Sequence, residues 1–361
     1  MRRTCTFVVF LLVLALTAAC GRPHHAAVAP ARSKPAGWTW QTTADANAGM
    51  PAADGGGVAS VLNHEEVVLL DARGNRKWEV TPGMNLYDTA PLLEHDTVYV
   101  ASDDGLVALD RATGATKWAT DLGDTGATPA RAGHLLVTTT WSKRMTAVDA
   151  DTGAVAWALD LPGQLYDQPS VVDGIAVATW DDGAHAALVG VDAATGALRW
   201  SCALPGGGVS APTISRDTAF VVAGDATAYA VDVRAGTPRW HAEMPGPGSP
   251  EVAPVVLAGG RVALADRDGD LKVVDIASGR EAWAVRGVGV AFRGGPVALG
   301  PDTVALPVDD GRVLIARGGK AVDVLDPSGL VPGVATSGDG RLVVATREGE
   351  PNVISARAWH A

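Results

Sequence analysis

A thirteen-residue phrase recurs along the chain, and this repetition restricts the possible folds more than any other feature. Each copy contains a short apolar run, an Asp, a turn that includes a Gly, and a closing Trp. The clearest copies are LVALDRATGATKW (106–118), MTAVDADTGAVAW (145–157), LVGVDAATGALRW (188–200), AYAVDVRAGTPRW (228–240) and LKVVDIASGREAW (271–283). Self-similarity of this kind indicates that one structural unit is built several times.

The spacing of the copies is close to forty residues. The closing tryptophans, together with Trp78 of the looser copy VVLLDARGNRKW (67–78), are 39 to 43 residues apart. A second series keeps nearly the same spacing: Pro51, Pro91, Pro129, Pro169, Pro212, Pro254 and Pro296. Two independent markers with nearly the same spacing indicate a true repeat, and a period near forty residues is typical of propeller blades or solenoid units.

Each unit contains four short runs with strand character, separated by turn signals. In the second unit the runs are APLLE (90–94), TVYVAS (97–102), LVALD (106–110) and TKWATDL (116–122). Polar and Gly-containing pairs between the runs favour turns, and no stretch beyond the N-terminal segment shows helical periodicity. We therefore predict an all-β fold, a β-propeller whose blades are four-stranded antiparallel sheets.

The phrase also indicates how neighbouring blades are held together. Its Gly supplies the positive φ of a tight hairpin, and its Asp fixes the turn through bonds to local backbone groups. We expect the Trp to fill the gap between blades, with room left by the small residue two places before the Asp (Ala108, Ala147, Gly190 or Ala230). The predicted structural repeat positions are Trp40, Trp78, Trp118, Trp157, Trp200, Trp240 and Trp283.

The two ends of the chain decide the number of blades. Two weaker units follow the last clear phrase, at 294–322 and 332–359, and the second supplies only three strands. The segment GWTWQTT (37–43) supplies the missing fourth strand, and pairing it with the last unit removes two exposed sheet edges. We predict eight blades over residues 37–361, closed by this N-terminal strand, with seven blades as the alternative if one weak unit is only a loop.

Residues 1–20 (MRRTCTFVVFLLVLALTAAC) have the layout of a secretory signal, and their apolar run is too short for a stable membrane span. The ending LTAAC resembles the lipobox of bacterial lipoproteins. This resemblance implies a signal peptide at 1–19 and a lipidated Cys20 that anchors the protein to a membrane; an ordinary signal peptide cut nearby is the alternative. The Pro/Ala-rich composition of residues 20–36 predicts a tether between the lipidated Cys and the propeller.

Charge and cysteine content exclude several functions. The net charge of −11 offers no basic surface for nucleic acid. Cys5 and Cys20 lie in or beside the N-terminal apolar segment, which leaves Cys202 alone, and we expect it to be a buried small hydrophobe. None of the common motifs for hydrolytic, metal-dependent or phosphate-binding catalysis is present, so we predict that the protein is not an enzyme.

The pattern A-x-D-x-x-T-G-x-x-x-W resembles the PQQ-like repeat, and the resemblance covers residues 37–361. Quinoprotein dehydrogenases with this repeat hold pyrroloquinoline quinone between a Trp face and a disulfide of adjacent cysteines, beside a calcium ion. This chain has no adjacent cysteine pair, and DRDGD (266–270) lacks the Glu that completes a calcium loop, so we expect neither quinone nor metal. The layout of signal, lipidated Cys, tether and propeller resembles the BamB family of lipoproteins of the outer-membrane β-barrel assembly machine.

Residues that break the repeat mark a candidate binding face. Loops that lead into the first strand of a blade and loops between its second and third strands emerge on one face of a propeller. Aromatic and charged residues in these loops suit a protein partner; the alternative is that they pack between blades or plug the channel. The candidate residues are Tyr87, Asp88, Trp141, Tyr166, Asp167, Trp180, Glu251 and Arg293.

Together these features predict an exported, lipid-anchored protein. It would lie at the outer face of the plasma membrane or, in a host with two membranes, at the periplasmic side of the outer membrane. We expect a monomer in isolation that serves as a non-catalytic scaffold for envelope protein partners. The alternatives are a BamB-like assembly factor for outer-membrane proteins, and a sensor or quinoprotein enzyme that binds a small molecule at the channel mouth.

Overall fold

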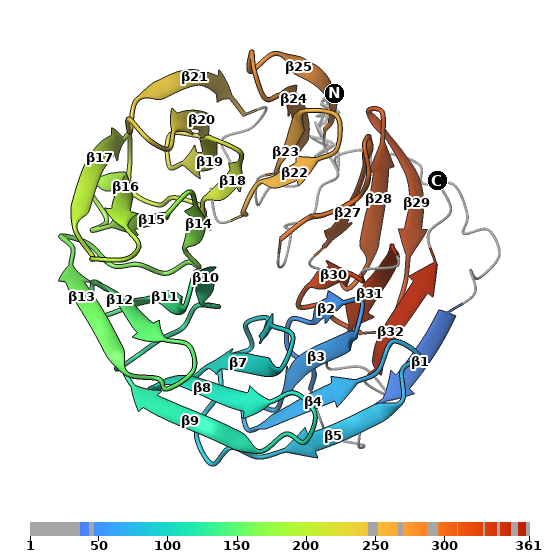
Figure 1. The fold of residues 1–361 in the computed structure, drawn as a ribbon. Coiled ribbons are helices and arrows are strands. Elements are labelled where there is room, and N and C mark those ends of the chain that lie inside the picture. The colour runs from blue at the N-terminus through green and yellow to red at the C-terminus, as the bar shows by residue number, and fades with distance from the viewer. Residues whose placement is uncertain are drawn as a thin grey trace, which may run out of the picture.

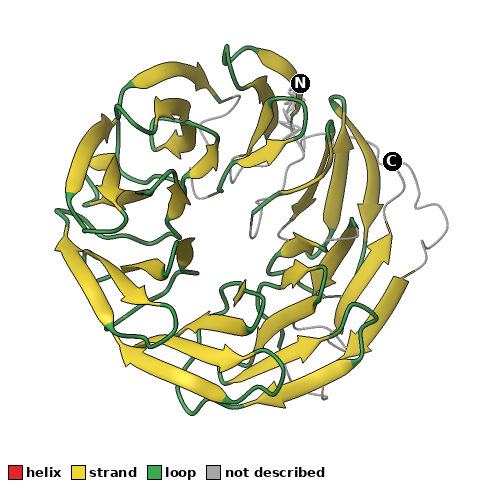
Figure 2. Ribbon diagram, viewed as in Figure 1, coloured by secondary structure: helices red, strands yellow, loops and turns green. Residues whose placement is uncertain are grey.

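The computed structural model describes residues 37–42, 47–244, 252–265, 270–286, 295–308, 310–327, 329–337, 340–347 and 353–358. In these residues thirty-two strands form eight four-stranded antiparallel sheets. The sheets stand as blades around a central hollow (Figure 1, Figure 2). The prediction of an all-β propeller with eight blades is confirmed, and the seven-bladed alternative is wrong. The described part of the chain contains no helix long and apolar enough to cross a membrane.

The blades are numbered in chain order, and the strands of each run from the centre of the ring to its perimeter. Blade 1 contains β2 (Ala52–Asp54), β3 (Gly57–Leu62), β4 (Glu66–Leu70) and β5 (Arg76–Val80). Blade 2 contains β6 (Leu92–Leu93), β7 (Thr97–Ala101), β8 (Gly105–Asp110) and β9 (Thr116–Asp121). Blade 3 contains β10 (Ala130–Ala132), β11 (Leu135–Thr140), β12 (Arg144–Asp149) and β13 (Val155–Asp160). Blade 4 contains β14 (Ser170–Val172), β15 (Ile175–Asp181), β16 (Ala186–Asp192) and β17 (Leu198–Leu204).

The second half of the ring has the same order. Blade 5 contains β18 (Thr213–Ser215), β19 (Thr218–Ala223), β20 (Thr227–Asp232) and β21 (Pro238–Glu243). Blade 6 contains β22 (Val255–Leu257), β23 (Arg261–Ala265), β24 (Leu271–Asp275) and β25 (Glu281–Val285). Blade 7 contains β26 (Val297–Gly300), β27 (Thr303–Pro307), β28 (Val313–Arg317) and β29 (Lys320–Leu325). Blade 8 contains β30 (Val334–Thr336), β31 (Arg341–Ala345), β32 (Val353–Ala358) and β1 (Gly37–Gln41).

The first strand of the chain closes the ring, as predicted. β1 pairs antiparallel with β32 along its whole length, from Gly37 opposite Arg357 to Gln41 opposite Val353. The N-terminal and C-terminal ends of the propeller therefore meet in one sheet. This pairing satisfies the backbone groups of two strands that would otherwise be open edges.

The apolar core lies between neighbouring blades. The second and third strands of most blades are almost entirely buried; β3 and β4 of blade 1 are an example. Their side chains form clusters with those of the next blade: Val61 and Leu69 of blade 1 pack with Val98 and Val107 of blade 2. Because each blade buries both of its faces against neighbours, the ring stabilises units that would be marginal alone.

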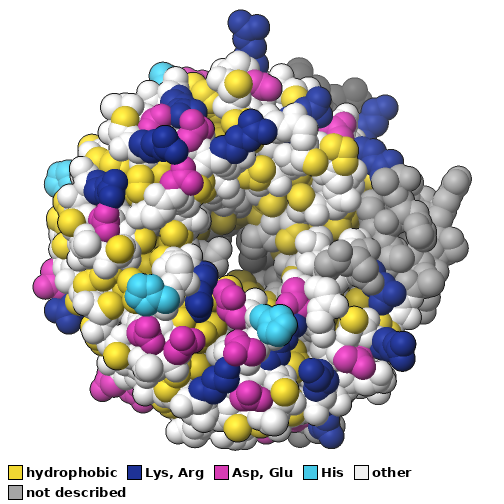
Figure 3. Space-filling model, in the orientation of Figure 1, with side chains coloured by type: hydrophobic (Ala, Val, Ile, Leu, Met, Phe, Trp, Pro, Cys, Tyr) yellow, Lys and Arg dark blue, Asp and Glu magenta, His cyan; other side chains and the backbone are white. Residues whose placement is uncertain are grey.

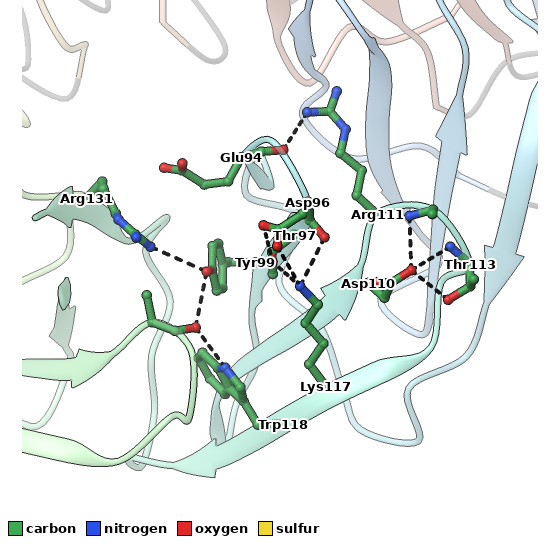
Figure 4. Close-up of polar contacts among 12 residues, drawn as sticks. Glu94, Asp96, Thr97, Tyr99, Asp110, Arg111, Thr113, Lys117, Trp118 and Arg131 are labelled. Atoms are coloured by element: carbon green, nitrogen blue, oxygen red, sulfur yellow. Dashed lines mark hydrogen bonds and ion pairs between the residues drawn. The ribbon is translucent and has the colours of Figure 1, made fainter. Parts of the chain in front are cut away.

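In blades 1 to 6 the repeated Trp joins its blade to the next, as predicted. The Trp118 indole N–H of blade 2 donates to the carbonyl of Ala150 in blade 3, at 2.9 Å (Figure 4). Its ring covers Gly153, whose φ of +73° suits glycine and where an added Cβ would lie 2.7 Å from a ring carbon. The equivalent indole N–H bonds link Trp78 to Arg111, Trp157 to Ala193, Trp200 to Val233, and Trp240 to Ile276.

The closing blade requires a correction to the predicted repeat series. Trp38, and not Trp40, takes the repeat position: its indole N–H donates to the carbonyl of Ala72 at 3.0 Å, and its ring covers Gly74. Trp38 also lies opposite Ala356, as each repeat Trp lies opposite a small or apolar residue. Trp40 packs against the same apolar cluster without this bond. The spacing of 40 residues from Trp38 to Trp78 matches the period better than the 38 residues from Trp40.

The Asp of the phrase fixes the outer hairpin. In blade 2 one carboxylate oxygen of Asp110 accepts bonds from the N–H groups of Ala112 and Thr113 and from the Thr113 hydroxyl (Figure 4). The Thr113 hydroxyl and then the Thr113 N–H lower the pKa of Asp110. Asp192 in blade 4 makes the same turn and also pairs with Arg199, whose guanidinium is the largest of the causes that lower the Asp192 pKa to about 2. The phrase is therefore architectural: its side chains are engaged in turns and blade contacts.

Candidate binding face

Two kinds of loop share one face of the ring. Leu86, in the loop that leads into blade 2, bridges to Ser102 at the end of the second strand of that blade. Its N–H donates to the carbonyl of His64, which lies in the loop between the second and third strands of blade 1. We call this side the loop face. The first-to-second and third-to-fourth strand turns meet on the opposite side, the turn face, where the Ala150 N–H donates to the His134 carbonyl. The predicted grouping of loops is confirmed.

Three of the candidate residues form a cluster on the loop face. Tyr87 comes from the loop into blade 2, Trp141 from the second-to-third strand loop of blade 3, and Tyr166 from the loop into blade 4. The centroid of the Trp141 ring lies 5.5 Å from the centroid of the Tyr87 ring, and the two ring planes are tilted by 51°. The corresponding values for Trp141 and Tyr166 are 6.5 Å and 55°. We call these three residues the aromatic cluster. Trp141 is 39% exposed and Tyr166 is 51% exposed, so the cluster faces solvent.

The backbone beneath the cluster holds Trp141 in place. The Trp141 N–H donates to the carbonyl of Asp124 at 3.1 Å. Gly126 lies against the indole, where an added Cβ would be 2.8 Å from the ring nitrogen. This close approach supports one side of the ring and leaves part of it open, so Trp141 is positioned by blade 3 and by the loop that precedes it.

Two carboxylates flank the Tyr87 end of the cluster. The Tyr87 hydroxyl donates to Asp124, and burial, followed by the Asp124 and Asp103 carboxylates, raises the pKa of Tyr87 to about 12. Asp103 accepts a bond from Asn85 through Oδ2, at 3.0 Å, whereas its Oδ1 is enclosed and has no hydrogen-bond partner among the described residues. Asp103 and Asp124 were not selected from the sequence, although both lie in loops of the two kinds predicted to form the binding face.

Asp88 and Asp167 have structural contacts. The Asp88 carboxylate lies 3.1 Å from Nη1 of Arg347 and 3.4 Å from Nε2 of His64, which ties the loop into blade 2 to blades 8 and 1. The carbonyl of Asp167 accepts a bond from the Thr139 hydroxyl of blade 3 at 2.7 Å. These two residues brace the loops that present the aromatic cluster.

Trp180 does not join the cluster, which corrects that part of the predicted face. It is half-buried near the end of β15 and packs against the apolar core between blades 3 and 4. Gly163 makes room for it, since an added Cβ there would lie 2.5 Å from the Trp180 ring. The alternative of packing between blades is thus correct for Trp180 but wrong for Trp141.

The remaining predicted positions are of two kinds. Glu251, Arg293, Cys20, the signal and the tether lie outside the described residues, as do residues 266–269 of the DRDGD segment. Cys202 is buried, as expected, and burial raises its thiol pKa. The described residues contain no group of three or more His, Cys, Asp or Glu side chains arranged to hold a metal ion.

Figure 3 shows the polar surface of one face of the ring. Acidic side chains gather beside the central hollow, over the blades that contain β3 and β7. Lys and Arg side chains lie mostly farther from the hollow. The surface near the channel mouth is therefore more acidic on this side of the ring than at the perimeter.

Solved structures share this architecture at low sequence identity. BamB from Moraxella catarrhalis matches with a TM-score of 0.72 and 18% identity, over 91% of this chain and 99% of that one. The computationally designed protein Ika8 matches with a TM-score of 0.74 and 17% identity, over 87% of this chain and 98% of that one. The quinohemoprotein alcohol dehydrogenase ADHIIG from Pseudomonas putida HK5 matches with a TM-score of 0.73 and 14% identity, over 89% of this chain and 75% of that one. No curated protein matches the chain.

The structural matches establish the fold alone, since enzymes, a designed protein and BamB share it. The sequence gives a narrower result. The family model described as outer membrane protein assembly factor BamB matches residues 25–120, 104–188 and 183–328, which together span most of the chain. The chain belongs to the BamB family of PQQ-like repeat β-propellers.

Proposed function

We propose that the protein is a non-catalytic scaffold of the cell envelope that binds a protein partner through the loop face. The aromatic cluster carries this proposal. Among the described residues, Trp141 and Tyr166 are large exposed aromatic side chains that the repeat does not use, and with the half-buried Tyr87 they span three consecutive blades. The repeat tryptophans, in contrast, are engaged in contacts between blades.

A protein partner fits the chemistry of the cluster. Tyr and Trp are enriched where interfaces gain most of their energy, because they combine a large contact area with few rotatable bonds. The three rings sit on loops held by backbone bonds to a rigid ring of sheets, so little ordering accompanies binding. Membership of the BamB family supports a role among envelope proteins.

Anchoring through Cys20 completes the proposed placement. The lipobox-like ending LTAAC supports lipidation, and the Pro/Ala-rich composition of residues 20–36 supports a tether between the anchor and the propeller. Metabolic labelling with a radioactive fatty acid tests this part. We expect label and membrane sedimentation in the wild-type chain and neither in Cys20→Ala; an unlabelled wild-type chain would contradict lipidation.

A finer proposal is assembly of outer-membrane proteins, which the description of the matching family model and the Moraxella catarrhalis structure support. The structural match to a quinohemoprotein alcohol dehydrogenase supports quinone chemistry as a competing candidate. The absence of an adjacent cysteine pair argues against it, because that pair is part of the resemblance to quinoproteins. An absorbance spectrum of the purified protein incubated with pyrroloquinoline quinone separates the two: we expect no bound quinone after gel filtration.

Site-specific photo-crosslinking in intact cells tests the binding face. A photoreactive Phe analogue replaces Tyr166 in the full-length protein, and the same analogue at Val155, 52% exposed on the perimeter, is the control. We expect a discrete crosslinked partner from position 166 but not from 155, and its loss when Trp141→Ala is added. The same products from both positions would overturn the proposal, provided that thermal unfolding shows intact folding.

A further inference from the structure

The aromatic cluster has a charge environment that selects among possible partner groups. Tyr87, Trp141 and Tyr166 offer ring faces, and the carboxylates of Asp103 and Asp124 lie at the Tyr87 end. Neither carboxylate has a Lys, Arg or His partner among the described residues. The cluster therefore combines π faces with uncompensated negative charge.

Carboxylates elsewhere in the chain are held in two ways. Some have a guanidinium partner: Arg111 lies 2.6 Å from Asp54, and Arg239 lies 2.8 Å from Asp217. Others, such as Asp110 and Asp149, accept hydrogen bonds within their own turns. On the loop face itself, Arg347 lies 3.1 Å from the neighbouring Asp88. Lys143 and Arg144, which follow Trp141, are directed to the Pro162 carbonyl and to Asp160, so none of these cations is paired with Asp103 or Asp124 among the described residues.

One oxygen in the cluster also lacks a donor. Oδ1 of Asp103 is enclosed and unbonded among the described residues, although its other oxygen accepts from Asn85. A buried carboxylate oxygen without a donor carries a desolvation cost, so the charge of Asp103 is not fully compensated by the described residues. A cation placed against the exposed part of Trp141 would be attracted by the ring face as well.

We propose that the aromatic cluster, with Asp103 and Asp124, binds a Lys or Arg side chain on an extended segment of a protein partner. This inference rests on the proposed function and names the chemistry that the face recognises. Two features support this occupant over an apolar or acidic one: the uncompensated carboxylates repel acids, and the tilted rings attract cations through their faces. The chain's net charge of −11 adds long-range attraction for a basic segment.

Peptide binding to the full-length protein tests the inference. The probes are Gly-Arg-Gly-Arg-Gly and its Glu and Gln counterparts, and calorimetry at low salt measures their affinities. We expect the Arg peptide to bind at least 10-fold more tightly than the Gln peptide, with no binding of the Glu peptide. Raising the salt concentration should weaken the binding of the Arg peptide, because salt screens the partly exposed carboxylates.

Variants assign the binding to the cluster. Trp141→Ala should lower the affinity for the Arg peptide by about 3- to 30-fold, whereas Trp141→Phe, which keeps a ring face, should lower this affinity less. Asp103→Asn should weaken it by a similar factor. The matched control is Asp151→Asn, which removes the same charge from an exposed turn on the turn face and should change nothing. Equal effects of Asp103→Asn and Asp151→Asn would show general electrostatics and overturn the inference.

Two further arms separate this inference from the proposed function. Tetramethylammonium that competes fully with the Arg peptide at equal concentration would assign the site to small organic cations and overturn a protein ligand. If the Tyr166 crosslink forms but the protein shows no preference for the Arg peptide, the scaffold function is retained and the recognition of a Lys or Arg side chain is refuted. A missing crosslink together with tight, cluster-dependent Arg binding would refute the scaffold function and leave a cation site.

Discussion

Gly190 tests how the repeated Trp is accommodated between strands. It lies directly opposite Trp200 in blade 4, at the position that Ala108, Ala147 and Ala230 take in other blades. An added Cβ at Gly190 would lie 2.1 Å from one carbon of the Trp200 ring. The φ of Gly190 is not positive, so the substitution Gly190→Ala acts through this contact and not through backbone strain.

The structure sets the size of the effect. Relief of the contact needs a shift of about 1.4 Å, since carbon atoms pack at about 3.5 Å or more. Trp200 is held on its other side by Gly236 and by the 2.7 Å bond from its indole N–H to the Val233 carbonyl, so the shift strains or breaks that bond. Overpacking at about 1–3 kcal/mol and a lost hydrogen bond at about 1 kcal/mol give a destabilisation of about 2–4 kcal/mol.

Thermal unfolding followed by circular dichroism measures this loss. For a propeller of this length we expect Gly190→Ala to lower the Tm by about 3–6 °C. Gly55→Ala is the matched control, because its added Cβ meets nothing within 4 Å, and its Tm should stay the same or rise slightly. In a Trp200→Phe background the cost of Gly190→Ala should shrink. An unchanged Tm for Gly190→Ala would refute the close packing of strand and indole.

Three other predictions follow from the same structure. The pKa of Asp192 is about 2 in the folded chain and 3.8 in the unfolded chain, so the stabilisation by its carboxylate is present above about pH 4 and is lost as the pH falls toward 2. In Asp192→Asn the Tm should therefore depend less on pH between pH 4 and pH 2. The same dependence as in the wild type would contradict the role of this carboxylate in the turn. Trp38→Phe removes the bond to the Ala72 carbonyl, so urea unfolding should show a loss about 1 kcal/mol larger than for Trp40→Phe; equal losses would restore Trp40 to the repeat series. Tyr87 should ionise near pH 12, and the ultraviolet difference titration of Tyr87→Phe should lack a step near pH 12 that the wild type shows.

The fold was largely predictable because its units are local and repeated. Four strands, three turns and one Trp lie within about forty residues, so turn residues and period report the blade without any long-range information. The one long-range step, pairing of β1 with β32, was predictable because blade 8 otherwise lacks a strand. Blade 7 was also recognisable from its strands, although its repeat Trp is missing.

The site was only partly predictable, because loop side chains depend on packing that the repeat does not encode. Trp141 and Trp180 occupy similar loops in neighbouring blades, yet Trp141 rests on Gly126 and faces solvent while Trp180 packs into the core. Asp88 is paired with Arg347, which lies 259 residues further along the chain, so its role in bracing the loop could not be read from local sequence. Two tryptophans in β1 made the register of the closing strand ambiguous until the indole bond of Trp38 identified it.

Hydrogen–deuterium exchange on the intact protein tests ring closure most directly. The peptide that covers β1 should be protected to the same degree as the outer strand β13, and its protection should fall together with that of β32 as urea is added. Exchange of the β1 amides at the rate of an unstructured peptide, with β32 still protected, would contradict a propeller closed by its N-terminal strand.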